Sequence, residues 1–364
     1  MTGRESCLSA TSTSFDHKSH CLSPLLHCKS IVSERPDPRR ECGTRSCKDI
    51  AMPQTKVALL SDYGDLDTLS IDTVDLPPPG PGQVRVRVAG AAVNPVDIKT
   101  RKGLLRDWFN LAFPAQLGND LAGVVEAVGE GVAKLQIGDR VAGLVDPAQG
   151  GAYAERANVY EAALVKVPDN LDLIDAAAAP TGALTGTQLI ERAIRPKPGD
   201  RILVTGASGS TGRAAVFAAL DAGAIVFAGV RASGVTAVAD LPVASVVVLE
   251  DQSSLETMGL LDAIADTIGG ETTEGLFMYV KPEGKVVSIA VPGPNPPIGS
   301  TQSYSPYVVT FDGERLERFF TDLDRLGRVM PVARRLPLED VREAHRLMEV
   351  GGLNGKIVLV PEAH

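Results

Sequence analysis

The chain has 364 residues, of which 44% are hydrophobic and 4% aromatic, and its formal net charge is −9. This length and composition fit a globular protein of two domains with an extension. The diffuse acidic charge argues against nucleic acid or an anionic membrane surface as the main partner. No apolar run approaches the ~20 residues that a membrane span needs. Neither nucleic acid nor a membrane span is therefore expected.

Residues 1–51 are rich in Ser, Arg, Cys and His and show neither helical nor strand periodicity, which predicts a disordered N-terminal extension. Three interpretations remain open: a dispensable tail before a start at Met52, a targeting peptide, or a metal-binding segment. The extension holds every cysteine of the chain: Cys7, Cys21, Cys28, Cys42 and Cys47. A body without cysteine forms neither a disulfide framework nor a cysteine-based zinc site.

The next segment, up to about residue 172, reads as a series of short strands. Gln83–Ala89 alternates polar and apolar residues with the period of two of a half-buried strand. Glycine-containing turns separate the apolar runs. Many short strands of this kind predict a barrel-like β unit. The expected strands are Lys56–Leu60, Gln83–Ala89, Gly123–Val128 and Arg140–Leu144.

From residue 173 helices and strands alternate, which predicts a doubly wound parallel sheet. The expected helices are Asp175–Arg192, Gly212–Ala222 and Leu255–Ile268. The expected strands are Arg201–Thr205, Ile225–Val230, Val243–Leu249 and Lys285–Ala290.

After Pro297 the order of elements is mixed. Asp312–Leu326 and Leu338–Val350 are predicted amphipathic helices. We expect the final strand, Lys356–Val360, to return to the β unit because the dinucleotide fold is already complete. An apolar stripe on the first helix indicates core or an oligomer surface and comprises Leu316, Phe319, Phe320 and Leu323.

A glycine-rich turn joins the strand Arg201–Thr205 to the helix that follows. Glycines let backbone N–H groups approach a pyrophosphate, and the helix N-terminus adds a favourable dipole. The spacing G-x-x-G-x-x-G is a variant of the dinucleotide-binding fingerprint. The predicted cofactor-binding glycines are Gly206, Gly209 and Gly212.

The strand after this turn ends at Val230 and is followed by Arg231, which stands 19 residues after Gly212. An NAD-binding fold usually carries Asp or Glu here to bind the ribose hydroxyls. Arginine instead suits a 2′-phosphate, and Ser233 offers a hydroxyl donor. These residues favour NADPH as the cofactor.

Several segments together resemble the zinc-free medium-chain dehydrogenase/reductase superfamily, in its quinone oxidoreductase, zeta-crystallin-like branch. They occur in the family's order between Lys56 and Val360. The matching segments are Asn94-Pro-Val-Asp97, Gly118-Asn-Asp120-Leu-Ala-Gly123-Val-Val-Glu-Ala-Val-Gly129, Gly138-Asp-Arg-Val141, Gly151-Ala-Tyr153-Ala-Glu155, Leu184-Thr185 and Gly355-Lys356-Ile-Val-Leu359.

The departures from the wider superfamily concern zinc. Its zinc alcohol dehydrogenases carry Cys where Asp97 stands and His-Glu where Asn119-Asp120 stand, and their four-cysteine structural lobe is missing here. We therefore expect no metal site. The turn is also more polar than the family's usual one. Its hydroxyls are interpreted as further phosphate donors and belong to Ser208, Ser210 and Thr211.

The resemblance implies site residues as well as a fold. Asn94 and Asp97 become candidate catalytic residues at the nicotinamide, the alternative for Asp97 being a carboxylate that caps the loop. Tyr63 is a candidate proton donor, or else a core aromatic residue. Thr185 is expected to touch the nicotinamide or the cofactor backbone. Lys356 is expected to close over the cofactor, the alternative being a surface lysine.

We predict an α/β protein: a GroES-like partly open β-barrel domain plus a Rossmann doubly wound parallel-sheet domain. The expected domains are residues 52–172 and 306–364 for the barrel and 173–305 for the NADP-binding domain. The predicted activity is NADPH-dependent hydride transfer to a quinone or an α,β-unsaturated carbonyl. An enoyl-thioester reductase of the polyketide type and a non-enzymatic NADPH-binding protein remain alternatives. The expected location is the cytoplasm, with the mitochondrion as alternative, and the resemblance allows a homodimer.

Overall fold

The structure is a computed structural model that describes residues 52–362. The predictions for residues 1–51 lie outside the described residues. Within the part of the chain that the structure describes, no helix is long and apolar enough to cross a membrane.

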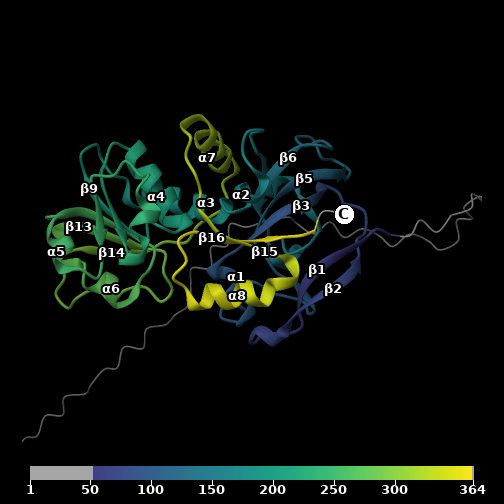
Figure 1. The fold of residues 1–364 in the computed structure, drawn as a ribbon, viewed down its shortest axis with the longest axis horizontal. Helices are drawn as coiled ribbons and strands as arrows, with labels where there is room; N and C mark the ends of the chain where they lie inside the picture. The colour runs from purple at the N-terminus through teal and green to yellow at the C-terminus, as the bar shows by residue number, and fades with distance from the viewer. Residues whose placement is uncertain (1–51, 363–364) are drawn as a thin grey trace, which may run out of the picture. The chain divides into compact units, whose positions relative to one another are not determined.

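Two sheets make up the barrel-like part of the molecule, on the right of Figure 1. A three-stranded sheet has the order β2-β1-β4, with β1 at Gln54–Leu60, β2 at Leu69–Asp75 and β4 at Ala115–Gln116. A seven-stranded sheet has the order β15-β16-β3-β5-β6-β8, with β7 also paired to β3. Its strands are β3 (Gln83–Val93), β5 (Asp120–Val128), β6 (Arg140–Leu144), β7 (Arg156–Tyr160), β8 (Leu164–Lys166), β15 (Val332–Pro337) and β16 (Lys356–Val360).

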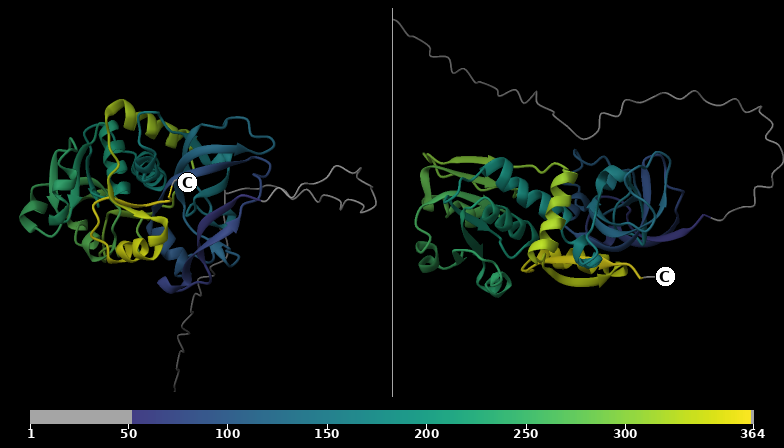
Figure 2. Two further views of the ribbon diagram at one scale, coloured as in Figure 1. Left: turned by 45° about the vertical axis from the view of Figure 1, so that its right-hand side comes forward. Right: turned by 90° about the horizontal axis from the view of Figure 1, so that it is seen from above.

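The last strand returns to this sheet, as the sequence predicted. β16 pairs antiparallel with β3, with Ile357 opposite Val93. Figure 2 shows the yellow C-terminal segment running beside the blue strands. This pairing brings Lys356 next to the end of β3, where α1 (Pro95–Arg101) begins.

The third sheet is parallel and has six strands in the order β11-β10-β9-β12-β13-β14. The chain order reverses beside β9, whose neighbours are β10 and β12. Ligands of doubly wound sheets bind at such a switch point, beyond the carboxyl ends of the strands. The strands are β9 (Arg201–Thr205), β10 (Ile225–Val230), β11 (Ser245–Val248), β12 (Leu261–Asp266), β13 (Val280–Ser288) and β14 (Ser303–Pro306).

Two helix predictions were wrong in their extent. The segment predicted as one helix over Leu255–Ile268 is a short helix, α5 (Gln252–Glu256), followed by the strand β12. β12 is buried along nearly its whole length, so its short apolar run carries no period that separates strand from helix. The helix predicted over Asp175–Arg192 is broken before Pro180. It becomes α2 (Leu173–Ala177), α3 (Pro180–Gln188) and a π-helical turn (Leu189–Ile194).

The other helices cover the sheets or connect them. The apolar stripe of α7 is buried in the core that α3 and α4 share. Of the two predicted roles, core or oligomer surface, the structure therefore supports core. The helices are α4 (Ser210–Asp221), α6 (Gly270–Glu274), α7 (Gly313–Leu326) and α8 (Val341–Val350).

Candidate functional site

Asn94 joins β3 to α1 and is fully buried. Its Nδ2 donates to Asp120 Oδ2 at 3.1 Å and to the Ala92 carbonyl at 3.3 Å, while its Oδ1 accepts a hydrogen bond from the Lys356 ammonium. An amide is suited to this place because it offers both a donor and an acceptor. Asn94 therefore links an anion on one side to a cation on the other.

Asp97 lies one turn further along α1 and is 1% exposed. Its Oδ2 accepts two hydrogen bonds, from the Asn94 backbone N–H at 2.7 Å and from the Tyr153 hydroxyl at 3.0 Å. Its Oδ1 is buried and has no hydrogen-bond partner among the described residues. Burial, with a smaller contribution from the charge of Asp120, raises the pKa of Asp97 to about 7.

Tyr153 is the residue of this cluster whose role the sequence did not indicate. Its ring lies so close to Gly118 that a Cβ there would stand 2.4 Å from Tyr153 Cδ1. The ring meets the buried imidazole of His345 edge-on, with centroids 5.8 Å apart. Burial raises the pKa of the Tyr153 phenol well above its usual range, so the hydroxyl is a hydrogen-bond donor at neutral pH.

Asp120 connects the barrel to α3. Its Oδ1 accepts from the Thr181 backbone N–H at 3.0 Å and from the Thr181 hydroxyl at 2.6 Å. Thr181 lies in the first turn of α3, where backbone N–H groups lack helical partners, so the carboxylate caps the helix from another part of the chain. Burial raises the pKa of Asp120, and Lys356 and the hydrogen bonds oppose that shift.

Lys356 is 6% exposed, which rules out the alternative of a surface lysine. Burial lowers the pKa of its ammonium, while Asp120 and Asp97 act to raise it. Its hydrogen bond to Asn94 joins residues 262 positions apart. We call Asn94, Asp97, Asp120, Tyr153 and Lys356 the buried polar cluster.

The glycine turn has the shape that a dinucleotide requires. Gly206 has φ +66°, and a Cβ on it would stand 2.4 Å from the Thr267 hydroxyl. A Cβ on Gly212 would stand 2.2 Å from the Gly206 carbonyl oxygen. Gly209 is the N-cap of α4, whose first N–H groups have no intrahelical partner. Side chains at Gly206 and Gly212 would thus disrupt the turn that presents these groups.

The hydroxyls of the turn differ in where they lie. Ser208 and Thr211 are partly exposed. Ser210 is buried, and a Cβ on Gly182 of α3 would stand 2.5 Å from its Oγ. Ser210 therefore directs its hydroxyl toward α3, and its backbone N–H is the group it offers at the helix start.

Asp266 braces the carboxyl ends of three parallel strands, and the sequence did not indicate it because its segment was predicted to be helical. It ends β12 and is fully buried. Its Oδ1 accepts from Thr205 Oγ1 at 2.8 Å and its Oδ2 from Ser288 Oγ at 2.5 Å, so it ties β12 to β9 and β13. Oδ1 also accepts from Ile268 N, Gly269 N and Thr273 Oγ1.

Arg231 follows β10 and is exposed, and no hydrogen bond or ion pair of its side chain is found among the described residues. The next residues form a short 3-10 turn, Ala232–Gly234, that approaches two other segments. The Ser233 carbonyl accepts from Asn354 Nδ2 at 3.0 Å. A Cβ on Gly234 would stand 3.2 Å from both Ser208 Oγ and Asn354 Oδ1. The glycine turn, the Arg231 segment and the loop before Lys356 therefore meet here.

Two predicted residues lie apart from these contacts. The Tyr63 hydroxyl donates to the Phe109 carbonyl at 3.4 Å, and its ring packs edge-on against Phe113 at 4.8 Å. Thr185 is buried in α3. No described contact joins either side chain to the buried polar cluster. From α3, it is Thr181 that reaches the cluster.

Comparison with known proteins identifies the family. Two family models match: the alcohol dehydrogenase GroES-like domain over residues 80–169 and the zinc-binding dehydrogenase over residues 233–359. The chloroplast envelope quinone oxidoreductase homolog of Arabidopsis thaliana is 30% identical over 309 residues, which cover 79% of this chain and 92% of that protein. The chain belongs to the medium-chain dehydrogenase/reductase superfamily, in its quinone oxidoreductase-like branch.

Two further relatives carry names of different kinds, one an oxidoreductase and one a polyketide synthase. The NADPH-dependent alkenal/one oxidoreductase of A. thaliana is 30% identical over 334 residues, covering 86% of this chain and 81% of that protein. A mycocerosic acid synthase-like polyketide synthase of Mycobacterium tuberculosis is 36% identical over 165 residues. That match covers 45% of this chain and 8% of the synthase, so the chain corresponds to a small part of it.

A solved structure supports the fold. The quinone oxidoreductase from Coxiella burnetii superposes with a TM-score of 0.73 at 23% identity, covering 85% of this chain and 99% of that one. The predicted fold class, a GroES-like β domain with a Rossmann domain, is thereby confirmed.

The second family model is named for zinc-binding dehydrogenases, which raises the question whether the described residues form a zinc site. Among residues 52–362, no group of three or more His, Cys, Asp or Glu side chains is arranged to hold a metal ion. Asp97 and Asp120 stand where the zinc relatives were expected to carry ligands, and the side chains beside them are an amide, a phenol and an ammonium. Zinc independence stays a prediction.

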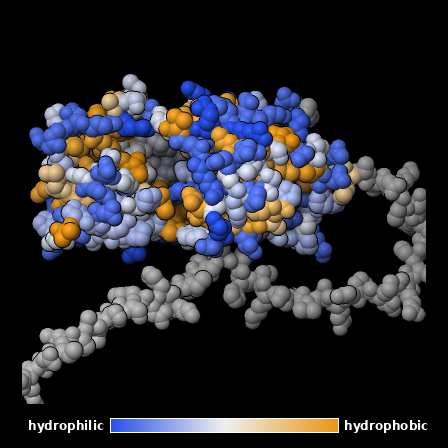
Figure 3. Space-filling view, turned by 90° about the horizontal axis from the view of Figure 1, so that it is seen from below, coloured by the Kyte–Doolittle hydropathy of each residue, from blue (hydrophilic) through white to orange (hydrophobic). Residues whose placement is uncertain are grey.

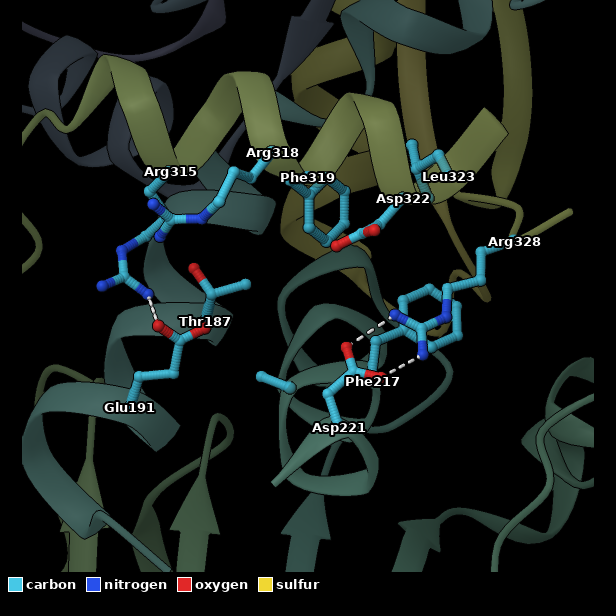
Figure 4. A pocket seen from close by; sticks show the side chains of 11 residues that line it. Thr187, Glu191, Phe217, Asp221, Arg315, Arg318, Phe319, Asp322, Leu323 and Arg328 are labelled. Atoms are coloured by element: carbon cyan, nitrogen blue, oxygen red, sulfur yellow. Dashed lines mark hydrogen bonds and ion pairs between the residues drawn. The ribbon is translucent and has the colours of Figure 1, made fainter. Parts of the chain in front are cut away.

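Two hollows are visible on the surface. Figure 3 shows one between the part with the six-stranded sheet, on the left, and the barrel-like part, on the right. Figure 4 shows a crevice between α3, α4 and α7, with the Arg315–Glu191 pair at one end and the Arg328–Asp221 pair at the other. No predicted cofactor or catalytic residue lines this crevice.

Proposed function

We propose that the protein is an NADPH-dependent reductase that delivers hydride to a quinone or to an α,β-unsaturated carbonyl compound without zinc. The observation that carries the proposal is the meeting of three segments around Gly234: the glycine turn through Ser208, the Arg231 segment, and the loop that leads into Lys356. The first two offer donors for a phosphorylated dinucleotide, and the third leads to the buried polar cluster.

The residues present fit a 2′-phosphorylated dinucleotide. The N–H groups at the start of α4 would hold its diphosphate, because Gly206 and Gly212 leave the backbone open there. Arg231 would hold the 2′-phosphate, since its guanidinium is exposed and makes no described ion pair. Ser208 and Ser233 lie beside it as further donors. Thr185 keeps the role that the family resemblance implies, contact with the nicotinamide or the cofactor backbone. Thr211 would offer its hydroxyl to the diphosphate, and Ser210 its backbone N–H, because the Ser210 hydroxyl is directed toward α3.

The bound cofactor supplies a hydride, and the chain supplies position and charge. Lys356, held by Asn94, places one positive charge beside the carboxyl groups of Asp97 and Asp120. Quinones and enones are intrinsically reactive acceptors, so orientation together with modest electrostatic stabilisation suffices for their reduction. This is why we propose chemistry without a metal.

An enoyl-thioester reductase is a second candidate, favoured by the likeness to the polyketide synthase segment. Its chemistry is the same conjugate addition of hydride. A third reading, an NADPH-binding protein without turnover, uses the same fold and the same glycine turn. Turnover would distinguish either reductase from a protein that only binds NADPH. The best acceptor would distinguish the quinone or enone reductase from the enoyl-thioester reductase.

The test is oxidation of NADPH, and of NADH in parallel, by the purified full chain with a chelator present. Quinones, enones and enoyl thioesters serve as acceptors. We expect turnover that survives chelation and prefers NADPH. Turnover that disappears with chelator and returns with Zn²⁺ would overturn zinc independence. Binding of NADPH without turnover on any acceptor would favour the non-enzymatic alternative.

We further propose a cytoplasmic homodimer with the barrel at residues 52–172 and 306–364 and the NADP-binding domain at 173–305. The open edge of the six-stranded sheet at β14 supports a second copy, because an unpaired edge offers backbone hydrogen bonds. Light scattering would give the molar mass, fluorescence imaging would give the compartment, and limited proteolysis would test the boundaries.

A further inference from the structure

The reduction of an enone needs a proton as well as a hydride, and the structure offers a group for it. Hydride addition to the β-carbon leaves an enolate, whose α-carbon must then take up a proton. We infer that Asp97 is held as a neutral carboxylic acid, with its proton on Oδ1, and that it protonates this carbon. The inference rests on the proposed function and names the proton donor for it.

The hydrogen bonds assign the proton to one oxygen. Asp97 Oδ2 already accepts two hydrogen bonds, from the Asn94 N–H and from the Tyr153 hydroxyl. Neither group can accept a hydrogen bond from a proton on Oδ2. A backbone N–H only donates, and the buried phenol keeps its proton and donates it to this oxygen. Oδ1 has no described partner although it is buried. A proton on Oδ1 is therefore consistent with every neighbour.

The charges around the cluster favour a neutral Asp97. The titratable groups that face it are Asp120 from β5, Tyr153 from the segment before β7, and Lys356 from β16. Two carboxyl groups thus share one ammonium. Asp120 accepts hydrogen bonds from Asn94 Nδ2 and from both Thr181 groups, which favours the charge on Asp120. One proton for the pair then belongs to Asp97.

The step balances. Bound NADPH would supply the hydride that adds to the β-carbon of the enone and leaves the enolate. The O–H bond at Asp97 Oδ1 breaks, a C–H bond forms at the α-carbon, and the enolate becomes a ketone. Asp97 is left as a carboxylate, stabilised by the Asn94 N–H, the Tyr153 hydroxyl and the Lys356 ammonium. It regains a proton from solvent before the next turnover.

Quinones give an internal control, because the reduced quinone takes its proton on oxygen, where water supplies it readily. We expect Asp97→Asn to lower enone reduction about 100-fold and quinone reduction by a clearly smaller factor. The wild-type enone rate falls above pH about 7, as Asp97 loses its proton, and the quinone rate does not. Equal losses with both acceptors would overturn the inference.

Two further readouts do not depend on rates. Reduction of a 2-methyl enone in D₂O places deuterium on one face of the α-carbon in the wild type and on both faces in Asp97→Asn. NMR titration of ¹³C-labelled aspartate in the wild type, with Asp97→Asn for assignment, shows the Asp97 carboxyl protonated at pH 6. Retained stereospecificity in Asp97→Asn, or an Asp97 carboxyl that is already ionised at pH 5, would overturn the inference.

Tyr153→Phe guards against a folding defect in Asp97→Asn. The change removes one donor to the carboxylate and so raises the pKa of Asp97 further. The fall in enone rate then moves to higher pH, which loss of structure would not cause. An unshifted profile in a folded Tyr153→Phe protein would contradict the inference. If the wild type reduces no acceptor, the proposed function fails with it, while the titration still reports the state of Asp97.

Discussion

Two buried carboxyl groups, Asp266 in the parallel sheet and Asp97 in the barrel, have opposite surroundings. Asp266 accepts hydrogen bonds on both oxygens, from three hydroxyls and two backbone N–H groups. Asp97 accepts two, both on Oδ2, and leaves Oδ1 without a described partner. The full set of donors around Asp266 serves architecture, and we propose that the unused oxygen of Asp97 serves proton transfer.

The largest expected effect is a loss of stability on removing the Asp266 carboxyl group, compared with the same change at Asp97. Asp266→Ala leaves the hydroxyls of Thr205, Thr273 and Ser288 and two N–H groups without their acceptor, and we expect a loss of about 4 kcal/mol. Asp97→Ala orphans only the Asn94 N–H and the Tyr153 hydroxyl and costs about 2 kcal/mol. Denaturant unfolding of both variants measures the difference. Equal losses would break the comparison.

The next prediction concerns the glycine turn that Asp266 braces. Gly212→Ala puts a Cβ 2.2 Å from the Gly206 carbonyl oxygen, which forces the backbone to move. We expect a loss of about 2 kcal/mol in stability and at least tenfold weaker NADPH binding, on the order of other overpacked sites. Fluorescence titration with NADPH and thermal unfolding measure the two effects.

Gly209→Ala is the matched control for that change. Its Cβ would meet the same carbonyl oxygen at 3.4 Å, an ordinary contact, and its φ of −86° suits any residue. We expect near-normal stability. A defect as large as that of Gly212→Ala would show that the turn is sensitive to any side chain, so that close approach is not the cause.

A surface residue of the same region is expected to affect affinity alone. Arg231→Ala removes the proposed partner of the 2′-phosphate and lowers NADPH affinity by about 2 kcal/mol, roughly 30-fold, with NADH affinity unchanged. Arg318→Ala, which removes another exposed arginine from the crevice of Figure 4, serves as the charge control. Isothermal titration calorimetry measures the affinity of both variants for NADPH and for NADH. A similar loss for NADH would contradict the assignment.

The smallest expected effect concerns the pH dependence of stability and comes from a histidine in the barrel-like part. His345 is fully buried, and neither ring nitrogen has a described partner. Burial, together with the nearby charge of Arg101, lowers its pKa from 6.5 to about 3. The unfolded chain therefore binds an extra proton between these values, so stability falls as the pH drops from about 6.5 toward 3. At neutral pH this residue contributes no such penalty.

His345→Phe removes that titration and two unsatisfied nitrogens. We expect unchanged stability at pH 7, or a gain of about 1 kcal/mol, and a shallower loss of stability on acidification. Urea unfolding at several pH values compares the variant with the wild type. A pH dependence as steep as that of the wild type would place the acid-sensitive group elsewhere.

Much of the secondary structure of this protein could be predicted from the pattern of adjacent residues. Strand Arg201–Thr205, the glycine turn and the helix after it were predicted from adjacent residues, because a tight turn and a helix start depend on neighbours in the chain. The two strands Arg140–Leu144 and Lys356–Val360 were also found with their observed limits. Absence of cysteine after Cys47 directed attention away from a cysteine-based metal site in the body of the chain.

Tertiary structure alone decided which polar groups meet. Lys356 reaches Asn94 across 262 positions, and Tyr153 reaches Asp97 across 56, through the pairing of strands whose register no local pattern records. Asp266 escaped notice because a short, fully buried strand has no period that separates it from a helix. Burial then sets the chemistry: a carboxyl group surrounded by donors braces the strands at Asp266, and we propose that one with few donors gives up a proton at Asp97.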